Sequence, residues 1–349
     1  MTTAEPSTWA LRADLAQAGL DHFFGAPHPQ YLNNTVPNEA GDNATFNYWW
    51  IAHVVDVRLD AFERTSDPRW LEQARVAHRN VLVRNGGSLF NDYFDDMLWY
   101  ALAILRMHSA TGDETYLEQA RAIWDHVVEN GWNDHLGPSL AWRKQQLDYK
   151  NTPANGPLVI LSARLSALGD DRAHLPTALA AFRWITDTLV DESTGFVQDG
   201  INRAQDGRID TQWRFTYNQG LYVGAAVELH RRTAQEHYLA RATRTALHAI
   251  AALATDGVFR DEGDGGDEGL FKGVFYRYVG QLLAVIDPDS DPAKELRAFI
   301  GTSVDALWRN SRRDGFLLAG NDWTRPAPGK VAYSTQLSAI TALEVRARL

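Results

Sequence analysis

The chain has 349 residues, and its 34 basic and 44 acidic side chains give a net charge of −10 with neutral histidines. This charge argues against a protein that binds nucleic acid or anionic membrane surfaces, because both kinds of partner require a basic face. The sequence has no cysteine, which excludes disulfides, thiolate metal sites and a cysteine nucleophile. Its 12 Trp, 12 Tyr and 14 Phe suit a large core, or a sugar-binding cleft in which flat rings stack on pyranose faces.

Targeting and cofactor motifs are not found in the sequence. No apolar run approaches the roughly 20 residues of a membrane span, and residues 1–7 lack the basic and apolar regions of a secretion signal. We therefore expect a cytoplasmic location for the chain as given, and a secreted one if a signal has been removed. There is no P-loop, dinucleotide fingerprint or zinc spacing, and the acidic run at 261–269 lacks the spacing of a calcium loop. We expect a monomer with no cofactor and no metal ion.

Apolar residues recur at helical spacing along almost the whole chain. This periodicity predicts twelve helices, at residues 7–20, 44–65, 68–84, 93–110, 114–129, 152–167, 173–190, 213–232, 236–254, 269–286, 292–310 and 331–347. Strand signals are confined to short pieces such as residues 195–199 and 315–318. No Pro- or Ser-rich linker divides the chain, so we expect a single domain over residues 1–349.

The connections between the predicted helices alternate between short and long. Helices that follow short connections, such as those beginning near Trp70 and Tyr116, carry charge on one face, as half-exposed helices do. Helices that follow long loops are apolar on more sides. Repeated hairpins of about 45–65 residues predict an all-α fold, the (α/α)6 barrel, in which six hairpins form an inner and an outer ring of helices. The long loops then gather at one end of the barrel, where we expect a cleft.

The chemistry-bearing residues fall at that end. Asp95 and Asp96 occupy the first turn of a predicted inner helix. Acidic residues are common there because the helix dipole stabilises each by about 0.3–1 kcal/mol, so a solvated face is the ordinary interpretation. A capping role is already available to Asn91 or Asp92. Aromatic side chains surround the pair and favour a site instead: Tyr93, Phe94, Trp99 and Tyr100.

Two carboxylates held together in an aromatic pocket do not titrate alike. At ~5 Å and an effective dielectric of ~20, their repulsion is of order 3 kcal/mol, or roughly two pKa units. One carboxyl should stay ionised while its neighbour keeps a proton towards neutral pH. Retaining glycoside hydrolysis needs such a pair, a nucleophile and a general acid about 5–5.5 Å apart. Neighbouring residues on a helix meet that spacing more readily than the wider one of inverting enzymes.

Several further motifs occur in register with this pair, and together they resemble glycoside hydrolase family 76, the endo-α-1,6-mannanases. The resemblance runs from about residue 45 to residue 280 and rests on residues 47–53 with Asp56, and on residues 94–99, 150–156, 195–200, 215–220 and 271–278. The sequence departs from the family at Phe94, where Tyr is usual, and at Met97, where Glu is frequent. These departures affect the details of sugar binding and leave the Asp pair intact.

The resemblance implies an (α/α)6 barrel and retaining hydrolysis of α-1,6-mannan, with Asp95 as nucleophile and Asp96 as acid/base. It also implies that Asp199 contacts the sugar at the cleavage subsite, although turn chemistry alone explains an Asp there equally well. Residues at the loop-to-helix junctions complete the expected substrate-binding set: Tyr217, Asn218, Trp213, Trp142, Lys150, Asn155, Lys272, Tyr93 and Phe94.

Three other functions stay open. A transglycosylase would pass the same covalent intermediate to a sugar acceptor instead of water. A sugar 2-epimerase of the same barrel would need histidines where this chain has Asp, Asn and Lys. A non-catalytic carbohydrate-binding protein would not require both carboxylates. The sequence does not distinguish endo from exo action.

Overall fold

The computed structural model describes residues 8–169, 173–263, 266–327 and 329–349, which form two compact units. The first unit lies within residues 1–84, 254–277 and 297–349, and the second within residues 85–253 and 278–296. Neither unit is continuous in the sequence. The predicted single domain over residues 1–349 stays a prediction.

The described residues form twelve α-helices, each at a predicted position and within four residues of its predicted ends. They are α1 (Thr8–Phe24), α2 (Tyr48–Thr65), α3 (Pro68–Arg84), α4 (Phe94–Thr111), α5 (Glu114–Gly131), α6 (Thr152–Ser166), α7 (His174–Leu189), α8 (Thr216–Thr233), α9 (Glu236–Leu253), α10 (Glu268–Leu283), α11 (Asp291–Asn310) and α12 (Tyr333–Arg348). None of these helices is long and apolar enough to cross a membrane.

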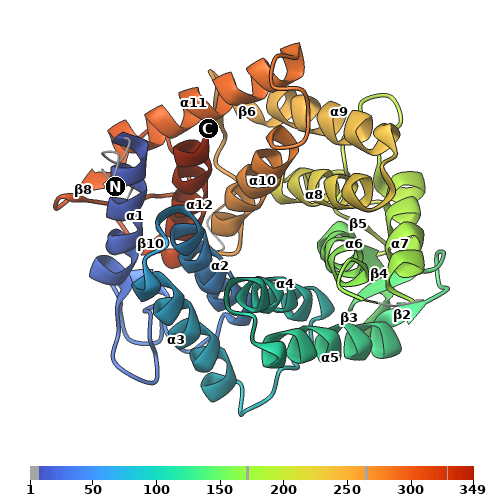
Figure 1. Ribbon diagram of the computed structural model, residues 1–349, viewed down its shortest axis with the longest axis horizontal. Coiled ribbons are helices and arrows are strands. Elements are labelled where there is room, and N and C mark those ends of the chain that lie inside the picture. Colours follow the sequence, from blue (N-terminus) through green and yellow to red (C-terminus); the bar gives the residue numbers. More distant parts are fainter. Residues whose placement is uncertain (1–7, 170–172, 264–265, 328) are drawn as a thin grey trace. The chain divides into compact units, whose positions relative to one another are not determined.

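In the second unit, helices of two kinds alternate along the chain. Helices α4, α6 and α8 pack side by side, and α5, α7 and α9 each cover one of them (Figure 1). Nearly every residue of α6 is buried, whereas α5 buries one face, from Leu117 through Ala120 to Trp124. Side-chain caps fix two of the helix starts, because Asp113 accepts from Thr115 N and Asn151 accepts from Ala154 N. The predicted alternation of buried and half-exposed helices is confirmed in this unit.

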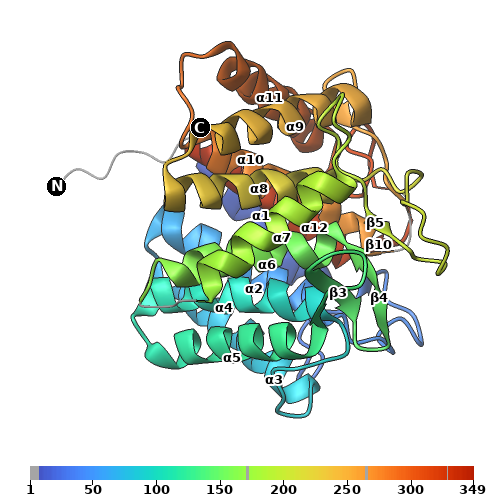
Figure 2. The ribbon, with the colours of Figure 1, turned by 90° about the vertical axis from the view of Figure 1, so that its right-hand side faces the viewer.

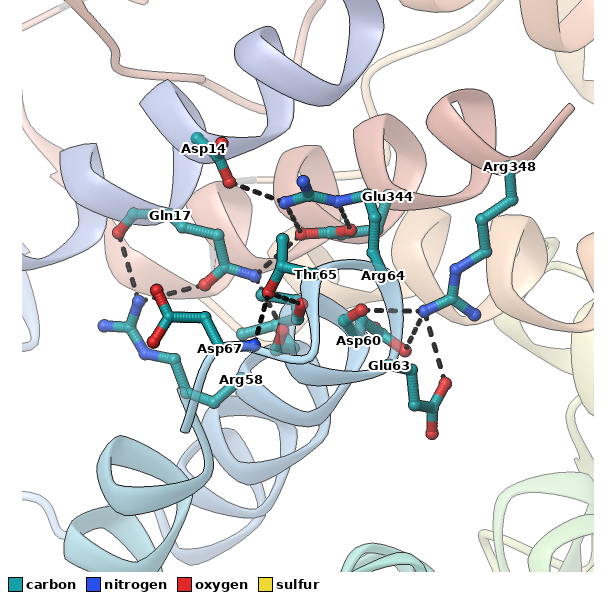
Figure 3. Close-up of polar contacts among 12 residues, drawn as sticks. Asp14, Gln17, Arg58, Asp60, Glu63, Arg64, Thr65, Asp67, Glu344 and Arg348 are labelled. Atoms are coloured by element: carbon teal, nitrogen blue, oxygen red, sulfur yellow. Dashed lines mark hydrogen bonds and ion pairs between the residues drawn. The ribbon is translucent and has the colours of Figure 1, made fainter. Parts of the chain in front are cut away.

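In the first unit, α2 packs against α3 and α12, and α12 packs against α1. A buried polar cluster joins three of these helices (Figure 3). Arg64 of α2 donates from Nε to Glu344 Oε2 at 2.7 Å and from Nη2 to Asp14 Oδ1 at 2.7 Å. Gln17 of α1 donates to the other oxygen of Glu344 at 3.1 Å. Burial raises the pKa of Glu344, and the Arg64 guanidinium opposes that rise.

Ten short strands lie between the described helices. They are β1 (Thr35–Val36), β2 (Trp132–Asn133), β3 (Ser139–Arg143), β4 (Gln146–Asn151), β5 (Gly200–Ile201), β6 (Ala254–Thr255), β7 (Val258–Phe259), β8 (Arg312–Arg313), β9 (Phe316–Leu317) and β10 (Val331–Ala332). Strands β2, β3, β4 and β5 form an antiparallel sheet at one end of the helices of the second unit (Figure 2). The other strands pair as β1 with β10, β6 with β7 and β8 with β9.

The β3–β4 hairpin was missed by the sequence analysis, which treated this stretch as a long loop. The strand expected at residues 315–318 is confirmed by β9. The one expected at residues 195–199 is reduced to a single bridge between Val197 and Val190, and β5 begins only at Gly200. A Cβ at Gly200 would lie 2.5 Å from the hydroxyl of Tyr149 on β4, so this close pairing requires glycine.

Candidate active site

The aspartate pair opens α4, in the second unit. The preceding residue, Tyr93, is the N-cap and makes no side-chain capping bond. Asp95 Oδ1 accepts from the backbone N–H of Asp96 at 2.9 Å, and Asp95 Oδ2 accepts from Trp142 Nε1 at 2.9 Å. Asp96 Oδ2 accepts from Asn91 Nδ2 at 3.1 Å. The two neighbouring carboxyls therefore have different hydrogen-bond partners, and those of Asp95 stabilise its charged form.

Trp142 reaches Asp95 because it lies on the β3–β4 hairpin. Its ring meets Tyr93 edge-on at 5.4 Å between centroids and Tyr149 edge-on at 5.6 Å. The Arg143 guanidinium lies 4.6 Å from the Trp142 ring centroid. These contacts hold the indole so that its N–H points at the carboxylate.

The hairpin is also bonded directly to the segment before α4. Lys144 N donates to Asp92 O at 3.0 Å, and Tyr93 forms an antiparallel bridge with Arg143. The backbone thus fixes the position of Trp142 relative to the start of α4.

Asp199 is 1% exposed, and both of its oxygens accept hydrogen bonds. Oδ1 accepts from Tyr217 Oη at 2.8 Å and Asn218 Nδ2 at 3.0 Å, both at the start of α8. Oδ2 accepts from Tyr149 Oη at 3.1 Å and Arg203 Nη2 at 2.5 Å. Burial raises the pKa of Asp199, and these donors oppose the rise.

The charge of Asp95 also acts on Tyr217, a hydrogen-bond partner of Asp199. Burial raises the pKa of Tyr217 well above its ordinary value, and the charges of Asp199 and Asp95 add to the rise. Asp95 and Asp199 therefore both act electrostatically on the Tyr217 hydroxyl.

Arg203 links Asp199 to an exposed aromatic ring. Its guanidinium lies 3.9 Å from the ring centroid of Trp213, whose exposed fraction is 39%. Its Nε donates to Asp210 Oδ2 at 3.0 Å. Trp213 presents apolar ring surface to solvent, as a sugar-stacking side chain must.

Three other expected substrate-binding residues are buried in the second unit. Lys150 donates from Nζ to Asn133 O at 2.6 Å and Gly137 O at 2.7 Å, and burial lowers its pKa to about 8. Asn155 holds β3 by accepting from Leu140 N at 2.9 Å and donating to Leu140 O at 2.9 Å. Phe94 is 0% exposed. In this structure Lys150 and Asn155 hold backbone around the hairpin. The roles of Lys150, Asn155 and Phe94 in binding sugar remain predictions.

Lys272 belongs to the first unit. It lies on α10 and donates from Nζ to Asn321 O at 2.7 Å and Asn321 Oδ1 at 2.6 Å. Burial lowers its pKa. Its predicted contact with the sugar is likewise untested.

Four residues with clear roles in this geometry are not among the predicted site residues: Asn91, Arg143, Tyr149 and Arg203. Asn91 was considered only as a cap. Tyr149 directly precedes the motif at residues 150–156, so its position next to Lys150 was a usable signal. Arg203 carries no comparable signal, because a lone Arg in a polar loop is ordinarily solvated.

No group of three or more His, Asp or Glu side chains within residues 8–169, 173–263, 266–327 and 329–349 is arranged to hold a metal ion. The acidic run at 261–269 includes residues 264 and 265, which lie outside the described residues.

Comparison with known proteins identifies the family. Residues 8–347 match the family described as glycosyl hydrolase family 76. The chain belongs to glycosyl hydrolase family 76. A crystal structure of a protein from Listeria innocua is 46% identical, with a TM-score of 0.94 and coverage of 97% of both chains. The predicted (α/α)6 fold class is confirmed by the likeness to the solved structures of this family.

An α-1,6-mannanase of Salegentibacter belongs to the same family as the chain. It is 34% identical, with a TM-score of 0.91 and coverage of 97% of this chain and 99% of that one. The structure compared is an inactive variant, with two successive aspartates changed to asparagine, in complex with α-1,6-mannotriose. A mannan endo-1,6-α-mannosidase of Saccharomyces cerevisiae is 24% identical over 65% of this chain. The match spans only 53% of the length of that yeast relative.

Proposed function

We propose that this family 76 glycoside hydrolase cleaves α-1,6-mannosidic linkages of a mannan backbone with retention of configuration, through a covalent glycosyl-enzyme. The observation that carries the proposal is the pair Asp95 and Asp96, adjacent in the first turn of α4 yet held by different donors. The mannanase relative that is inactive without two successive aspartates supports the choice of this pair. The activity of that relative and the names of the curated yeast relatives support the substrate.

Asp95 is the nucleophile in this proposal. Two N–H groups, from Trp142 and from the backbone of Asp96, donate to its carboxylate and favour the charged form that attack requires. One Asp95 oxygen forms a bond to the anomeric carbon while the bond from that carbon to the leaving O6 breaks. Asp96 gives its proton to O6, so the shortened chain leaves as a neutral alcohol.

The second step reverses these roles. Asp96, now ionised, takes a proton from a water molecule as the water oxygen attacks the anomeric carbon. The bond to Asp95 breaks, and the nucleophile regains its charge. Two inversions at one carbon give net retention. Adjacent residues of one helical turn leave little room for the water that an inverting enzyme places between its carboxyls.

Aromatic rings provide the sugar-binding surface in this proposal. Trp213 has apolar surface open to solvent, and Tyr93 and Trp142 flank the aspartate pair. Rings of this kind stack on the C–H faces of mannose units. Asp199 is buried, so its part in the proposal is to orient Tyr217 and Asn218.

Incubation with linear α-1,6-mannan, followed by proton NMR and chromatography, tests the proposal. We expect short mannooligosaccharides whose first-formed reducing ends are α-anomers, which later mutarotate. First release of β-anomers would mean an inverting reaction. Chains longer than the substrate would indicate transglycosylation, and an unchanged polymer would favour the epimerase or the non-catalytic binding protein.

A further inference from the structure

Asn91 lies in a tightly bonded loop immediately before α4. Its Oδ1 accepts from Tyr93 N at 2.8 Å, which fixes the orientation of the amide, because only the Nδ2 side remains to face Asp96. Asn85 Nδ2 donates to Phe90 O at 3.0 Å, just before Asn91. The bond from Lys144 N to Asp92 O, just after it, joins the loop to the hairpin. Asn91 is therefore anchored on both sides.

The contact of Asn91 with Asp96 involves one defined oxygen. The Nδ2 group donates to Asp96 Oδ2 at 3.1 Å. In a protonated carboxyl the carbonyl oxygen is the better acceptor and the other oxygen carries the proton. An N–H aimed at Oδ2 therefore favours the form of Asp96 whose proton is on Oδ1.

We infer that Asn91 is a positioning residue that holds the proton of Asp96 on Oδ1, so that this oxygen delivers it to the leaving group. The inference rests on the proposed function, in which Asp96 is the general acid. It assigns to Asn91 a part in the reaction distinct from that of Trp142, whose N–H serves the other aspartate. The same N–H bond stabilises ionised Asp96, so it also limits the pH up to which the acid stays protonated.

The sharpest variant is Asn91→Asp. An aspartate keeps an oxygen for Tyr93 N–H but replaces the donor to Asp96 with a second carboxylate. That charge disfavours the ionised form of Asp96, so the basic limb of the kcat/KM profile on mannan should move up by about one pH unit. The loss of proton positioning should lower kcat/KM on mannan about tenfold or more. Asn91→Ser keeps a short acceptor, removes the N–H donor and adds no charge, and it should shift the limb in the same direction by less.

A second substrate separates positioning from a general structural effect. A dinitrophenyl glycoside of α-1,6-mannobiose needs no protonation of its leaving group, and kcat/KM reports only the first chemical step. Asn91→Asp and Asn91→Ser should lower kcat/KM on this substrate less than about threefold, since only acid catalysis is disturbed. Gln235→Glu adds the same charge at an exposed site just beyond the C-terminal end of α8. It should change neither the pH profile of kcat/KM nor the ratio of kcat/KM between the two substrates.

The outcome is decided by two comparisons. Equal losses on both substrates, or an unmoved basic limb in both Asn91 variants, would overturn the inference and leave the proposed function standing. Asp96→Asn is measured alongside. If that variant keeps wild-type turnover on mannan, the proposed function itself fails, whatever the Asn91 variants show. Thermal unfolding of each variant confirms that the fold is retained.

Discussion

At the scale of single residues, the different roles of the two aspartates depend on which groups donate hydrogen bonds to each. The carboxylate of Asp95 accepts from Trp142 and from the backbone, whereas Asp96 accepts from Asn91. Local donors of this kind make two chemically identical side chains inequivalent. The assignment of nucleophile and acid can therefore be tested by changing one carboxyl at a time.

The first prediction concerns these two carboxyls. Asp95→Asn and Asp96→Asn should each lower kcat on mannan by about a thousandfold or more, because each removes an obligatory chemical group. On the dinitrophenyl mannobioside, Asp96→Asn should retain a fast first step, seen as a burst of dinitrophenol, while Asp95→Asn should give none. Equal behaviour of the two variants on this substrate would contradict the assigned roles.

A second prediction concerns Asp199. Its carboxylate accepts hydrogen bonds from four side chains. Asp199→Asn replaces one of the two accepting oxygens with an NH2 group, which then faces the donors that the oxygen had bound. We expect a loss of about 2–4 kcal/mol in the free energy of unfolding, since buried charged partners are left unmatched. We also expect kcat to fall more than KM rises, because Tyr217 and Asn218 lose their orientation. Urea unfolding and steady-state kinetics measure the two effects, and a change confined to KM would count against this role.

The sequence led to the aspartate pair but not to all of its partners. Asp95 and Asp96 stand out as adjacent charges among aromatic residues at a helix start. Asn91 is visible too, but the sequence suggests only a capping role for it, and that is wrong, because Tyr93 is the N-cap and Asn91 Oδ1 accepts from the N–H of Tyr93 itself, ahead of the helix. Which residue meets its other side depends on the side-chain rotamer, and no spacing rule specifies that.

At the scale of elements, the hairpin of β3 and β4 is the part that sequence periodicity missed. Buried residues of β3 are consecutive rather than alternating, from Ser139 to Ala141, so the two-residue period of a half-exposed strand is absent. The helices were predicted correctly because the helical spacing of their apolar residues continues over four or more turns. The hairpin nevertheless carries Trp142 to Asp95, and its contribution can be isolated.

The third prediction is made for Trp142. Trp142→Phe keeps an aromatic ring between Tyr93, Tyr149 and Arg143 but removes the N–H that donates to Asp95. A hydrogen bond to a charged group is worth about 1.5–3 kcal/mol, so kcat/KM on mannan should fall about 10- to 150-fold. The melting temperature should change little, in contrast to Trp142→Ala, which also removes the packing. A Trp142→Phe enzyme with wild-type kcat/KM would show that this bond has no part in catalysis.

At the scale of the whole molecule, acid stability depends on buried histidines in both units. Burial lowers the pKa of His53, His78 and His174 to about 4 from an ordinary 6.5. Between pH 4 and pH 6.5 these histidines bind protons in the unfolded chain but not in the folded chain. The stability that they contribute is therefore present above about pH 6.5 and is lost as the pH falls towards 4. Asp56, Asp60 and Arg277 surround His53, and the two carboxylates partly oppose its shift.

The fourth prediction follows from these histidines. Between pH 6.5 and pH 4 the free energy of unfolding should fall by about 1–2 kcal/mol less in His174→Phe than in the wild type, because one proton-binding site of the unfolded chain is gone. Urea denaturation at a series of pH values measures the slope. His135→Phe, at an exposed site in the same unit, serves as the control and should leave the slope unchanged. A parallel slope in wild type and His174→Phe would contradict the prediction.

The last prediction concerns whether the two compact units unfold together. The chain passes between them after residues 84, 253, 277 and 296, and α10 and α11 each contribute residues to both. The family match also extends across both units, over residues 8–347. A helix shared between two units cannot stay intact in one while the other unfolds, so we expect one cooperative transition, as the single-domain prediction requires.

Arg64→Met provides the decisive perturbation, because it acts in the first unit only. It leaves the buried Glu344 without its guanidinium partner, which should cost about 3–5 kcal/mol of unfolding free energy. Native-state hydrogen exchange followed by mass spectrometry should then show equal acceleration in the most protected peptides of α2 and of α6, which lie in different units. Calorimetry should give matching calorimetric and van't Hoff enthalpies. Acceleration confined to peptides of the first unit, or two calorimetric peaks, would mean that the chain comprises two domains.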